Sequence, residues 1–293
     1  MHSRLHLGEM EAHLTEADRK TALVTGSTDG VGRVVAKRLS ERGWRVLVHG
    51  RDRDRGHALV TEIEAAGGTA EFLPADLSSL VEVRGLANTV TEKTGRLDLL
   101  INNAGLGTGG PRATRQTSAD GYELRFAVNY LAGFVLTHLL LPLIKGSAPA
   151  RIVNVSSVGQ EAIDFDDVML MHGYSGLRAY RQSKLAQILF TIDLARAHAD
   201  SGITANALHP ATYMDTAMVR QSGVTPISSV DQGAAAILRL AVSPELDGRT
   251  GLFFNGQQEA RADAQAYDAE ARQRLKALSF KLGGLSANEY AAL

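Results

Sequence analysis

Two side chains in the second half of the chain have the types and the spacing needed for proton transfer. Tyr180 and Lys184 stand four residues apart in the segment YRQSK, a spacing that places both side chains on one face of a helix. A free tyrosine, with a pKa of about 10, exchanges protons poorly near neutral pH, but a neighbouring ammonium favours the phenolate and lowers this pKa. We therefore predict that Tyr180, assisted by Lys184, protonates a carbonyl oxygen as a hydride reaches the carbon. Because Tyr-x-x-x-Lys also occurs by chance on solvated helix faces, the prediction depends on the surrounding motifs.

A glycine-rich turn, TGSTDGVG at residues 25–32, lies directly between a predicted strand and a predicted helix. Glycines in that position let the backbone approach a pyrophosphate, and the helix N-terminus offers free N–H groups and a partial positive charge. The spacing G-x-x-x-G-x-G differs from the G-x-G-x-x-G of many dinucleotide-binding proteins. We predict a dinucleotide site here, with an ordinary turn as the alternative.

The residues after the second predicted strand favour NADP(H) over NAD(H). An acidic residue at the end of that strand would bond the ribose 2′-hydroxyl and repel a 2′-phosphate. The strand instead ends in the sequence HGR, and the first carboxylate comes at Asp52. Arg51 can clamp a phosphate with bidentate bonds, and Arg33 adds a second positive charge. A solvated surface arginine is the alternative, and the carboxylate of Asp29 disfavours a phosphate, so NAD(H) stays possible.

The elements that must position these residues alternate along the chain. Short apolar runs predict strands at residues 20–25, 45–49, 70–74, 97–102, 151–156, 204–208 and 251–255. Amphipathic stretches predict helices from the glycine turn to residue 43 and over 54–66, 79–93, 119–145 and 177–199, with 119–145 bent or divided. Such alternation implies parallel strand pairs joined by right-handed crossovers. The predicted fold class is α/β: a single-domain Rossmann fold with a doubly wound, mostly parallel sheet of about seven strands and helices on both faces.

The 293 residues are predicted to divide into one large domain and two additions. The domain covers 20–258, and within it the segments 158–177 and 213–228 are predicted to form a substrate lid. Residues 1–19 form a polar N-terminal extension, and residues 259–293 a helical C-terminal extension.

Composition excludes several classes of function. The net charge of -1 gives no bulk attraction to nucleic acid or anionic membranes. The absence of cysteine excludes disulfides, thiolate metal sites and a cysteine nucleophile, and no other cluster has metal-ligand spacing. The N-terminus lacks the apolar region of a signal peptide. No stretch approaches the roughly 20 apolar residues of a membrane span, and the most apolar window, 134–144, is predicted to be a core helix. We expect a cytoplasmic protein without a membrane, nucleic-acid or metal partner.

Several motifs, in the right order between residues 20 and 208, resemble those of the short-chain dehydrogenase/reductase superfamily. They are TGSTDGVG, DL at 76–77, NNAG at 102–105, Asn129, VSS ending at Ser157, and YRQSK. Within the superfamily, HGRD, RFAVNYLAGFVLTHLLLPLI, RIVNVSSVG and AYDAEARQRLKALS resemble the retinol-dehydrogenase-like and WW-domain-oxidoreductase-like branch.

The resemblance implies a role for each matching residue. Tyr180 would be the acid–base group, and Lys184 would lower its pKa and bond the nicotinamide ribose. Ser157 would hold the substrate carbonyl, and Asn129 would position Lys184 through water. Ser157 is preferred to Ser156 because the family serine is the second of the pair, and the choice matters because neighbouring residues of a strand face opposite ways. The residues expected to contact the cofactor, besides Tyr180 and Lys184, are Gly26, Ser27, Thr28, Gly30, Val31, Gly32, Arg33, Arg51, Asp76, Leu77, Asn103, Ala104, Gly105, Pro210 and Thr212.

The chain departs from the family pattern after the sixth strand, where Pro210-Ala211-Thr212 replaces the usual Pro-Gly. Alanine lacks glycine's freedom at positive φ, so the local turn differs, although we expect Thr212 to reach the carboxamide.

The sequence predicts a carbonyl reductase, or an alcohol dehydrogenase in reverse, acting on a bulky, largely apolar ketone, aldehyde or secondary alcohol. The methionines of the lid segments suit an irregular apolar ligand, but packing of the lid against the core explains them equally. A non-catalytic dinucleotide sensor is the alternative function. A nucleotide-sugar epimerase or dehydratase is disfavoured by the glycine spacing. The resemblance further implies a homodimer or homotetramer.

Overall fold

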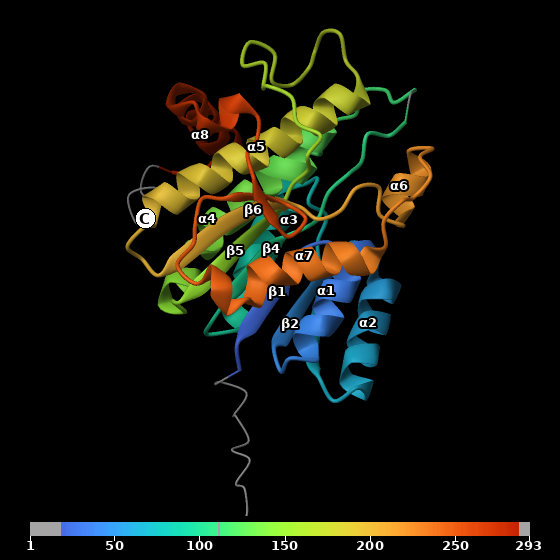
Figure 1. The fold of residues 1–293 in the computed structure, drawn as a ribbon, viewed down its shortest axis with the longest axis vertical. Coiled ribbons are helices and arrows are strands. Elements are labelled where there is room, and N and C mark those ends of the chain that lie inside the picture. Colours follow the sequence, from blue (N-terminus) through green and yellow to red (C-terminus); the bar gives the residue numbers. More distant parts are fainter. Residues whose placement is uncertain (1–18, 111, 287–293) are drawn as a thin grey trace, which may run out of the picture.

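The computed structural model describes residues 19–110 and 112–286, which form one layered sheet with helices on both faces (Figure 1). Nearly all of the predicted N-terminal extension and the end of the predicted C-terminal extension lie outside these residues. The strands of the described part are β1 (Thr21–Val24), β2 (Arg45–Gly50), β3 (Thr69–Pro74), β4 (Leu99–Asn102), β5 (Ala150–Val155), β6 (Ile203–His209), β7 (Phe253–Asn255) and β8 (Gln258–Ala260).

The strands lie in the order β3-β2-β1-β4-β5-β6-β7-β8, and every pair except β7–β8 is parallel. The order reverses between β1 and β4, which is the point where ligands bind in doubly wound sheets. This confirms the predicted fold class. The sequence did not predict β8, because this three-residue edge strand, QEA, has no apolar run. It begins at the boundary proposed between domain and extension.

Eight α-helices and one π-helix in the described residues carry the functional segments. They are α1 (Gly30–Ser40), α2 (Arg53–Ala65), α3 (Leu80–Lys93), a π-helix (Phe126–Leu131), α4 (Ala132–Gly146), α5 (Gly176–Ala197), α6 (Ala217–Gln221), α7 (Val230–Val242) and α8 (Ala269–Gly283). Polar caps set several of the N-termini: Asp29 accepts from the first backbone N–H of α1, and Ser175 accepts from Arg178 N in α5. Helices α6 and α7 were not among the predicted elements.

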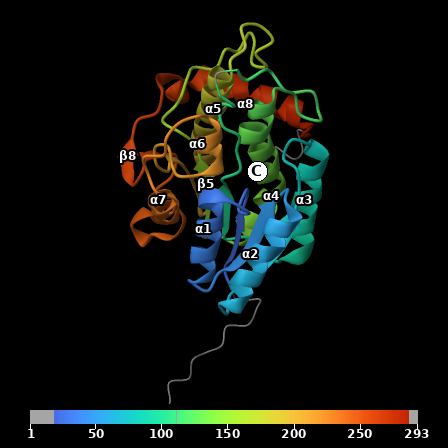
Figure 2. The same cartoon turned by 90° about the vertical axis from the view of Figure 1, so that its right-hand side faces the viewer.

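Alternating strand residues build two separate cores, one on each face of the sheet. Leu23 and Leu100 face α3, α4, α5 and α8, whereas Val24 and Ile101 face α1 and α7. Figure 1 shows α1, α2 and α7 on one side, and Figure 2 shows α8 lying across the α4–α5 layer. Because the apolar runs are buried on both faces, the polar residues gather at the strand ends.

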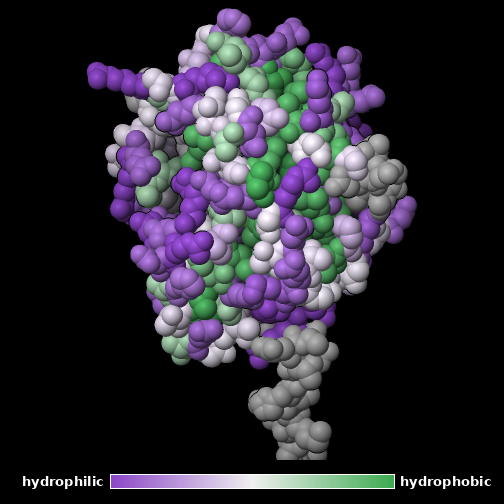
Figure 3. Space-filling model, turned by 180° about the vertical axis from the view of Figure 1, so that it is seen from behind, coloured by the Kyte–Doolittle hydropathy of each residue, from purple (hydrophilic) through white to green (hydrophobic). Residues whose placement is uncertain are grey.

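The predicted helix over 119–145 begins later than expected and is divided. Thr117 and Glu123 pair as an isolated bridge, and the π-helix interrupts the helix before α4. The segment Phe126–Gly146, with a hydropathy of 1.7, is long and apolar enough to cross a membrane, which corrects the expectation that no such stretch exists. Its window is 67% buried inside the fold, as in the core helix of a soluble protein. The view from behind shows a band of apolar side chains among polar ones (Figure 3).

Candidate active site

Asn103, just after β4, locks the glycine turn between β1 and α1. Its amide Nδ2 donates to Thr25 O at 2.8 Å and Gly26 O at 3.1 Å, and its backbone N donates to Thr25 Oγ1 at 2.9 Å. A Cβ on Gly32 would lie 2.5 Å from Asn103 Nδ2, and one on Gly26, whose φ is +63°, would lie 2.8 Å from Ala104 Cα. Neither site has room for a side chain. From the sequence we expected Asn103 to contact the cofactor, but we did not predict its hydrogen bonds to the glycine turn.

His49, at the end of β2, holds the same turn from the other side. Its ring Nδ1 accepts a hydrogen bond from Gly26 N at 3.1 Å, and its backbone N donates to Ser27 Oγ at 3.0 Å. The side chain is buried, and burial lowers the pKa of His49 to about 4. A neutral ring is what this bond requires, since a protonated ring nitrogen cannot accept.

The charges beside β2 are arranged differently from the prediction. Arg51 is 67% exposed, and its Nη1 lies 3.8 Å from Asp76 Oδ2. Arg33, expected to add a second positive charge, is instead paired with Glu62 of α2. The carboxylate of Asp29 is neutralised by an arginine of α2 at 3.0 Å. Arg51, with a long, weak ion pair, therefore remains the exposed positive charge expected to meet the phosphate.

The two serines after β5 face opposite ways. Ser156 Oγ donates to the backbone O of Lys184 at 2.7 Å. The Ser157 hydroxyl accepts from Gly159 N at 3.0 Å, and a Cβ on Gly159 would lie 3.4 Å from Ser157 Oγ and 3.8 Å from Tyr180 Cε1, so the two side chains lie close together. Ser157 and Tyr180 thus present two hydroxyl groups at one point beyond the carboxyl end of β5.

Lys184 is buried behind this pair. Its Nζ donates to Val155 O at 2.9 Å and Gln187 Oε1 at 3.1 Å, and burial lowers the pKa of Lys184 to about 7. Burial raises the pKa of Tyr180, against the opposing effect of the nearby Ser157 hydroxyl. Nζ of Lys184 lies 5.8 Å from the Tyr180 ring centre, and the effect of Lys184 on the pKa of Tyr180 stays a prediction. Gln187 was not singled out from the sequence.

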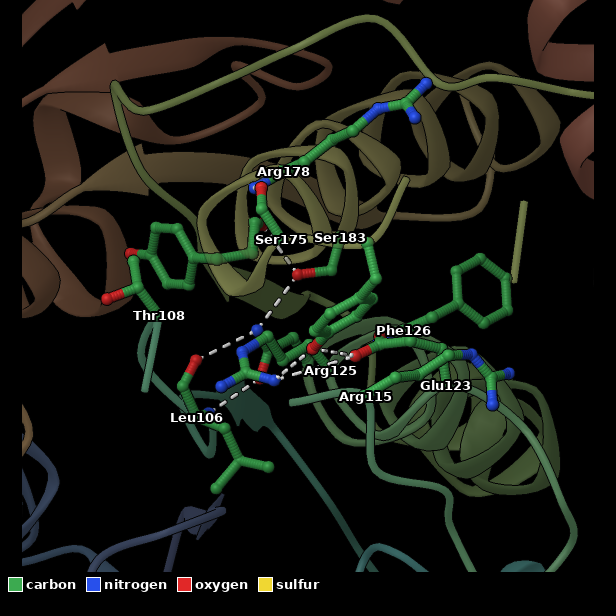
Figure 4. Close-up of polar contacts among 12 residues, drawn as sticks. Leu106, Thr108, Arg115, Glu123, Arg125, Phe126, Ser175, Arg178 and Ser183 are labelled. Carbon is green, nitrogen blue, oxygen red and sulfur yellow. Dashed lines mark hydrogen bonds and ion pairs between the residues drawn. The ribbon is translucent and has the colours of Figure 1, made fainter. Parts of the chain in front are cut away.

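Asn129 lies in the π-helix and joins α5 to the loop after β4. Its Nδ2 donates to Ser183 Oγ at 2.9 Å and to Leu106 O at 3.1 Å, while its Oδ1 accepts from Leu106 N at 2.6 Å. Ser183 Oγ in turn donates to Tyr180 O at 2.7 Å. Figure 4 shows Leu106 and Ser183 at this junction. A π-turn often occurs where a functional side chain must be redirected, and here it turns Asn129 toward the site.

Comparison with known proteins identifies the family of this chain. The model of the short chain dehydrogenase family matches residues 20–225. The chain belongs to the short-chain dehydrogenase family.

This dehydrogenase is similar to named relatives over most of its length. Retinol dehydrogenase 13 of Homo sapiens is 37% identical, over 92% of this chain and 86% of the relative. Polyprenol dehydrogenase of Mus musculus is 36% identical, over 90% and 84%. The similarity confirms the retinol-dehydrogenase-like branch and an NAD(P)-dependent enzyme acting on CH–OH or C=O groups.

Two solved structures resemble the dehydrogenase in fold. The Pseudomonas aeruginosa RhlG/NADP active-site complex has a TM-score of 0.66 and 29% identity, over 80% of this chain and 94% of that one. A blue fluorescent protein from a metagenomic library, in complex with NADPH, has a TM-score of 0.65 and 28% identity, over 81% and 97%.

The segment after β6 places two threonines in different surroundings. Thr212 Oγ1 lies 3.0 Å from His209 Nε2, so its hydroxyl already has a partner. Thr216 was not predicted, yet its Cγ2 lies 3.4 Å from the position of a Cβ on Gly30, directly against the glycine turn of the dehydrogenase. The available signal was a threonine before a short apolar helical stretch, since Thr216 caps α6.

The two predicted lid segments are strained and apolar at the surface. The described residues with positive φ other than glycine are Leu170 (49°) and Tyr213 (46°), one in each segment. Tyr213 is close enough to Tyr180 to raise its pKa. Six of the eight exposed large hydrophobic residues in the described chain belong to these segments: Val158, Met171, Leu177, Tyr213, Met218 and Ile227.

Proposed function

We propose that this dehydrogenase is an NADP(H)-dependent carbonyl reductase, reversible as an alcohol dehydrogenase, that acts on bulky apolar ketones, aldehydes or secondary alcohols. The observation that carries the proposal is the Ser157–Tyr180 hydroxyl pair, with Lys184 buried behind it and Asn129 beside it. A non-catalytic sensor would have no use for a proton donor aligned in this way.

In the proposed reduction, Ser157 holds the carbonyl oxygen against Tyr180. The phenol O–H of Tyr180 donates its proton to that oxygen, which avoids a free alkoxide. The bound nicotinamide supplies the hydride to the carbonyl carbon, so that the product is the alcohol. Lys184, with a pKa of about 7, can give or take a proton near neutral pH and so can restore the phenol.

The residues at the glycine turn suit a dinucleotide. Gly26 and Gly32 leave the backbone bare where a side chain would block its approach. Asp52, the first carboxylate after β2, caps α2 by accepting from Arg55 N and is therefore engaged away from a ribose. Arg51 supports the 2′-phosphate form of the cofactor, and the two similar solved structures bind NADP or NADPH.

The exposed hydrophobic side chains of the two lid segments, here called the apolar rim, support a bulky apolar substrate. Exposed hydrophobic side chains concentrated on two segments beside a polar site mark a surface for an apolar ligand. The relatives named for retinol and polyprenol, both long apolar alcohols, support the same class.

The test is turnover with NADPH and NADH on a panel of small and bulky aldehydes and ketones. We expect faster reduction with NADPH, and Arg51→Ala should lower kcat/KM for NADPH roughly 10- to 100-fold, the effect of losing a charge-assisted bond, without changing that for NADH. Arg53→Ala, at the exposed neighbouring arginine, is the matched control. Equal use of NADH by the wild type would refute the NADP(H) preference, and no turnover of any carbonyl would refute the activity.

A further inference from the structure

A buried ion pair just before the π-helix is bridged by a tyrosine of the lid. The side chains of Glu123 and Arg125 are 1% and 7% exposed, and their Oε1 and Nη1 atoms lie 3.7 Å apart. The Tyr174 hydroxyl donates to Glu123 Oε1 at 3.1 Å and accepts from Arg125 Nη1 at 2.7 Å. This one hydroxyl therefore completes the hydrogen bonding of two charges that are out of contact with water.

The same pair holds the loop after β4. Arg125 Nε donates to Gly107 O at 2.7 Å, and Glu123 Oε2 accepts from Phe126 N at 2.7 Å at the start of the π-helix. A Cβ on Gly109 would lie 2.4 Å from Arg125 Nη2, so the guanidinium packs directly on the loop backbone. Figure 4 shows Arg125 between Glu123 and Leu106.

The loop after β4 also connects this ion pair to the proposed active site through hydrogen bonds. Leu106, adjacent to Gly107, bonds Asn129 through both its backbone N and O, and Asn129 bonds Ser183, which bonds Tyr180 O. A continuous series of hydrogen bonds and covalent neighbours thus runs from the lid to the residue proposed as the acid–base group.

The lid is attached to this corner at a second point as well. Glu123 N donates to Met169 Sδ at 3.4 Å, and Arg115 Nε donates to Met169 O at 2.9 Å. At the start of α5, a Cβ on Gly176 would lie 2.0 Å from Thr108 O, so this helix rests on the loop. The hydrogen bonds of Tyr174 to Glu123 and Arg125 are therefore one of several contacts that hold the lid in a fixed position.

We propose that Tyr174 is a positioning residue that sets the loop of residues 105–110 and the lid in register with Asn129 and Tyr180. Its contribution rests on the proposed function, because the loop and the lid would form the substrate side of the pocket. The glycine turn is held separately, by Asn103 and His49, so we expect the cofactor side of the site to depend less on Tyr174 than the substrate side.

The test removes a single oxygen atom with Tyr174→Phe. We expect KM for a bulky carbonyl to rise roughly 10-fold, since displacements of an ångström in a positioned site have effects of this order or larger. The change in kcat should be smaller, and the Kd for NADPH should stay within about 2-fold of wild type. Hydrogen exchange of the amides in residues 104–110 should become faster. The matched control is Tyr122→Phe, because the hydroxyl of this nearby tyrosine donates to a group outside the ion pair, Leu282 O of α8, at 3.1 Å.

The two hypotheses fail in different ways. If wild-type protein reduces no carbonyl, the proposed function is wrong, but the exchange measurement still tests the network. If Tyr174→Phe leaves both KM and the exchange of residues 104–110 unchanged, or if Tyr122→Phe changes them equally, the positioning role is wrong.

Discussion

The two ends of the proposed active site are built on opposite principles. At the cofactor end, the glycine turn is fixed by buried hydrogen bonds from Asn103 and His49, and its glycines have no space for a Cβ. At the substrate end, the lid segments 158–177 and 213–228 expose apolar side chains and include both described non-glycine residues at positive φ. The cofactor end is therefore constrained to one fixed ligand, whereas the substrate end leaves room for ligands that vary.

Removing the group between the two ends should have the largest effect. Tyr180→Phe keeps the ring and deletes the proton donor, so turnover should fall roughly 10³-fold, within the range for general acid–base groups. Because the glycine turn is untouched, the Kd for NADPH should stay near the wild-type value. Wild-type rates in this variant would eliminate Tyr180 as the acid–base group.

Crowding the cofactor end should have the next largest effect. In Gly32→Ala the new Cβ meets Asn103 Nδ2 and Gly26 O, each at 2.5 Å, so the turn must open. We expect NADPH affinity to fall on the order of 100-fold, about 2.7 kcal/mol, as measured by fluorescence titration. The control is Gly85→Ala in α3, where nothing lies within 4 Å of the new Cβ and helix propensity predicts a gain of about 1 kcal/mol in stability. Similar losses in both variants would contradict the assigned packing.

Acid should weaken the cofactor end through His49. The folded-state pKa of about 4 lies below the ordinary histidine value of 6.5, so between these values the unfolded chain binds a proton that the folded chain excludes. The free energy of unfolding should therefore fall as the pH drops from 6.5 to 4. Of this loss, His49 should account for about 2 kcal/mol by pH 4.5. Urea unfolding of His49→Gln against wild type at pH 7 and 4.5 measures this share. An equally steep loss in both proteins would assign the acid sensitivity to other groups.

The smallest effect is expected at the lid. Ile227 is 70% exposed, so Ile227→Ser should change the free energy of unfolding by less than about 0.5 kcal/mol. KM for bulky apolar carbonyls should rise roughly 3-fold from the lost apolar contact, and KM for a small aldehyde should not change. An equal shift for both substrates would argue against an apolar rim for the substrate.

Local pattern was sufficient to predict most of the fold. The strands that are buried on both faces carry unbroken apolar runs, and the glycine turn and the Tyr180–Lys184 pair follow from short-range spacing. The three-residue strand β8 has no such run, and the start of the helix near residue 124 depends on the Thr117–Glu123 bridge. Such pairing is a tertiary contact, which periodicity does not encode.

The electrostatic details of the site depended on long-range packing in the same way. Arg33 could not be known to pair with Glu62, because the two lie 29 residues apart on different helices. The lowered pKa of Lys184 and the raised pKa of Tyr180 result from burial, which residue type alone does not reveal. Asn103 was located correctly at a strand end, but its role in holding the glycine turn required the fold.

The π-helix at Phe126–Leu131 has a consequence for how this protein could have diverged. Bonds from residue i to i+5 accommodate one more residue per turn than bonds from i to i+4, and each residue rotates a helix by about 100°. Loss of one residue here would restore an α-helical turn and rotate the residues before the deletion by about 100° relative to those after it. Asn129 would then no longer point toward both Leu106 and Ser183. The position of Asn129 therefore depends on the number of residues in this segment. Substitutions that keep this number leave the register of the helix unchanged, and a later substitution can restore a lost side chain.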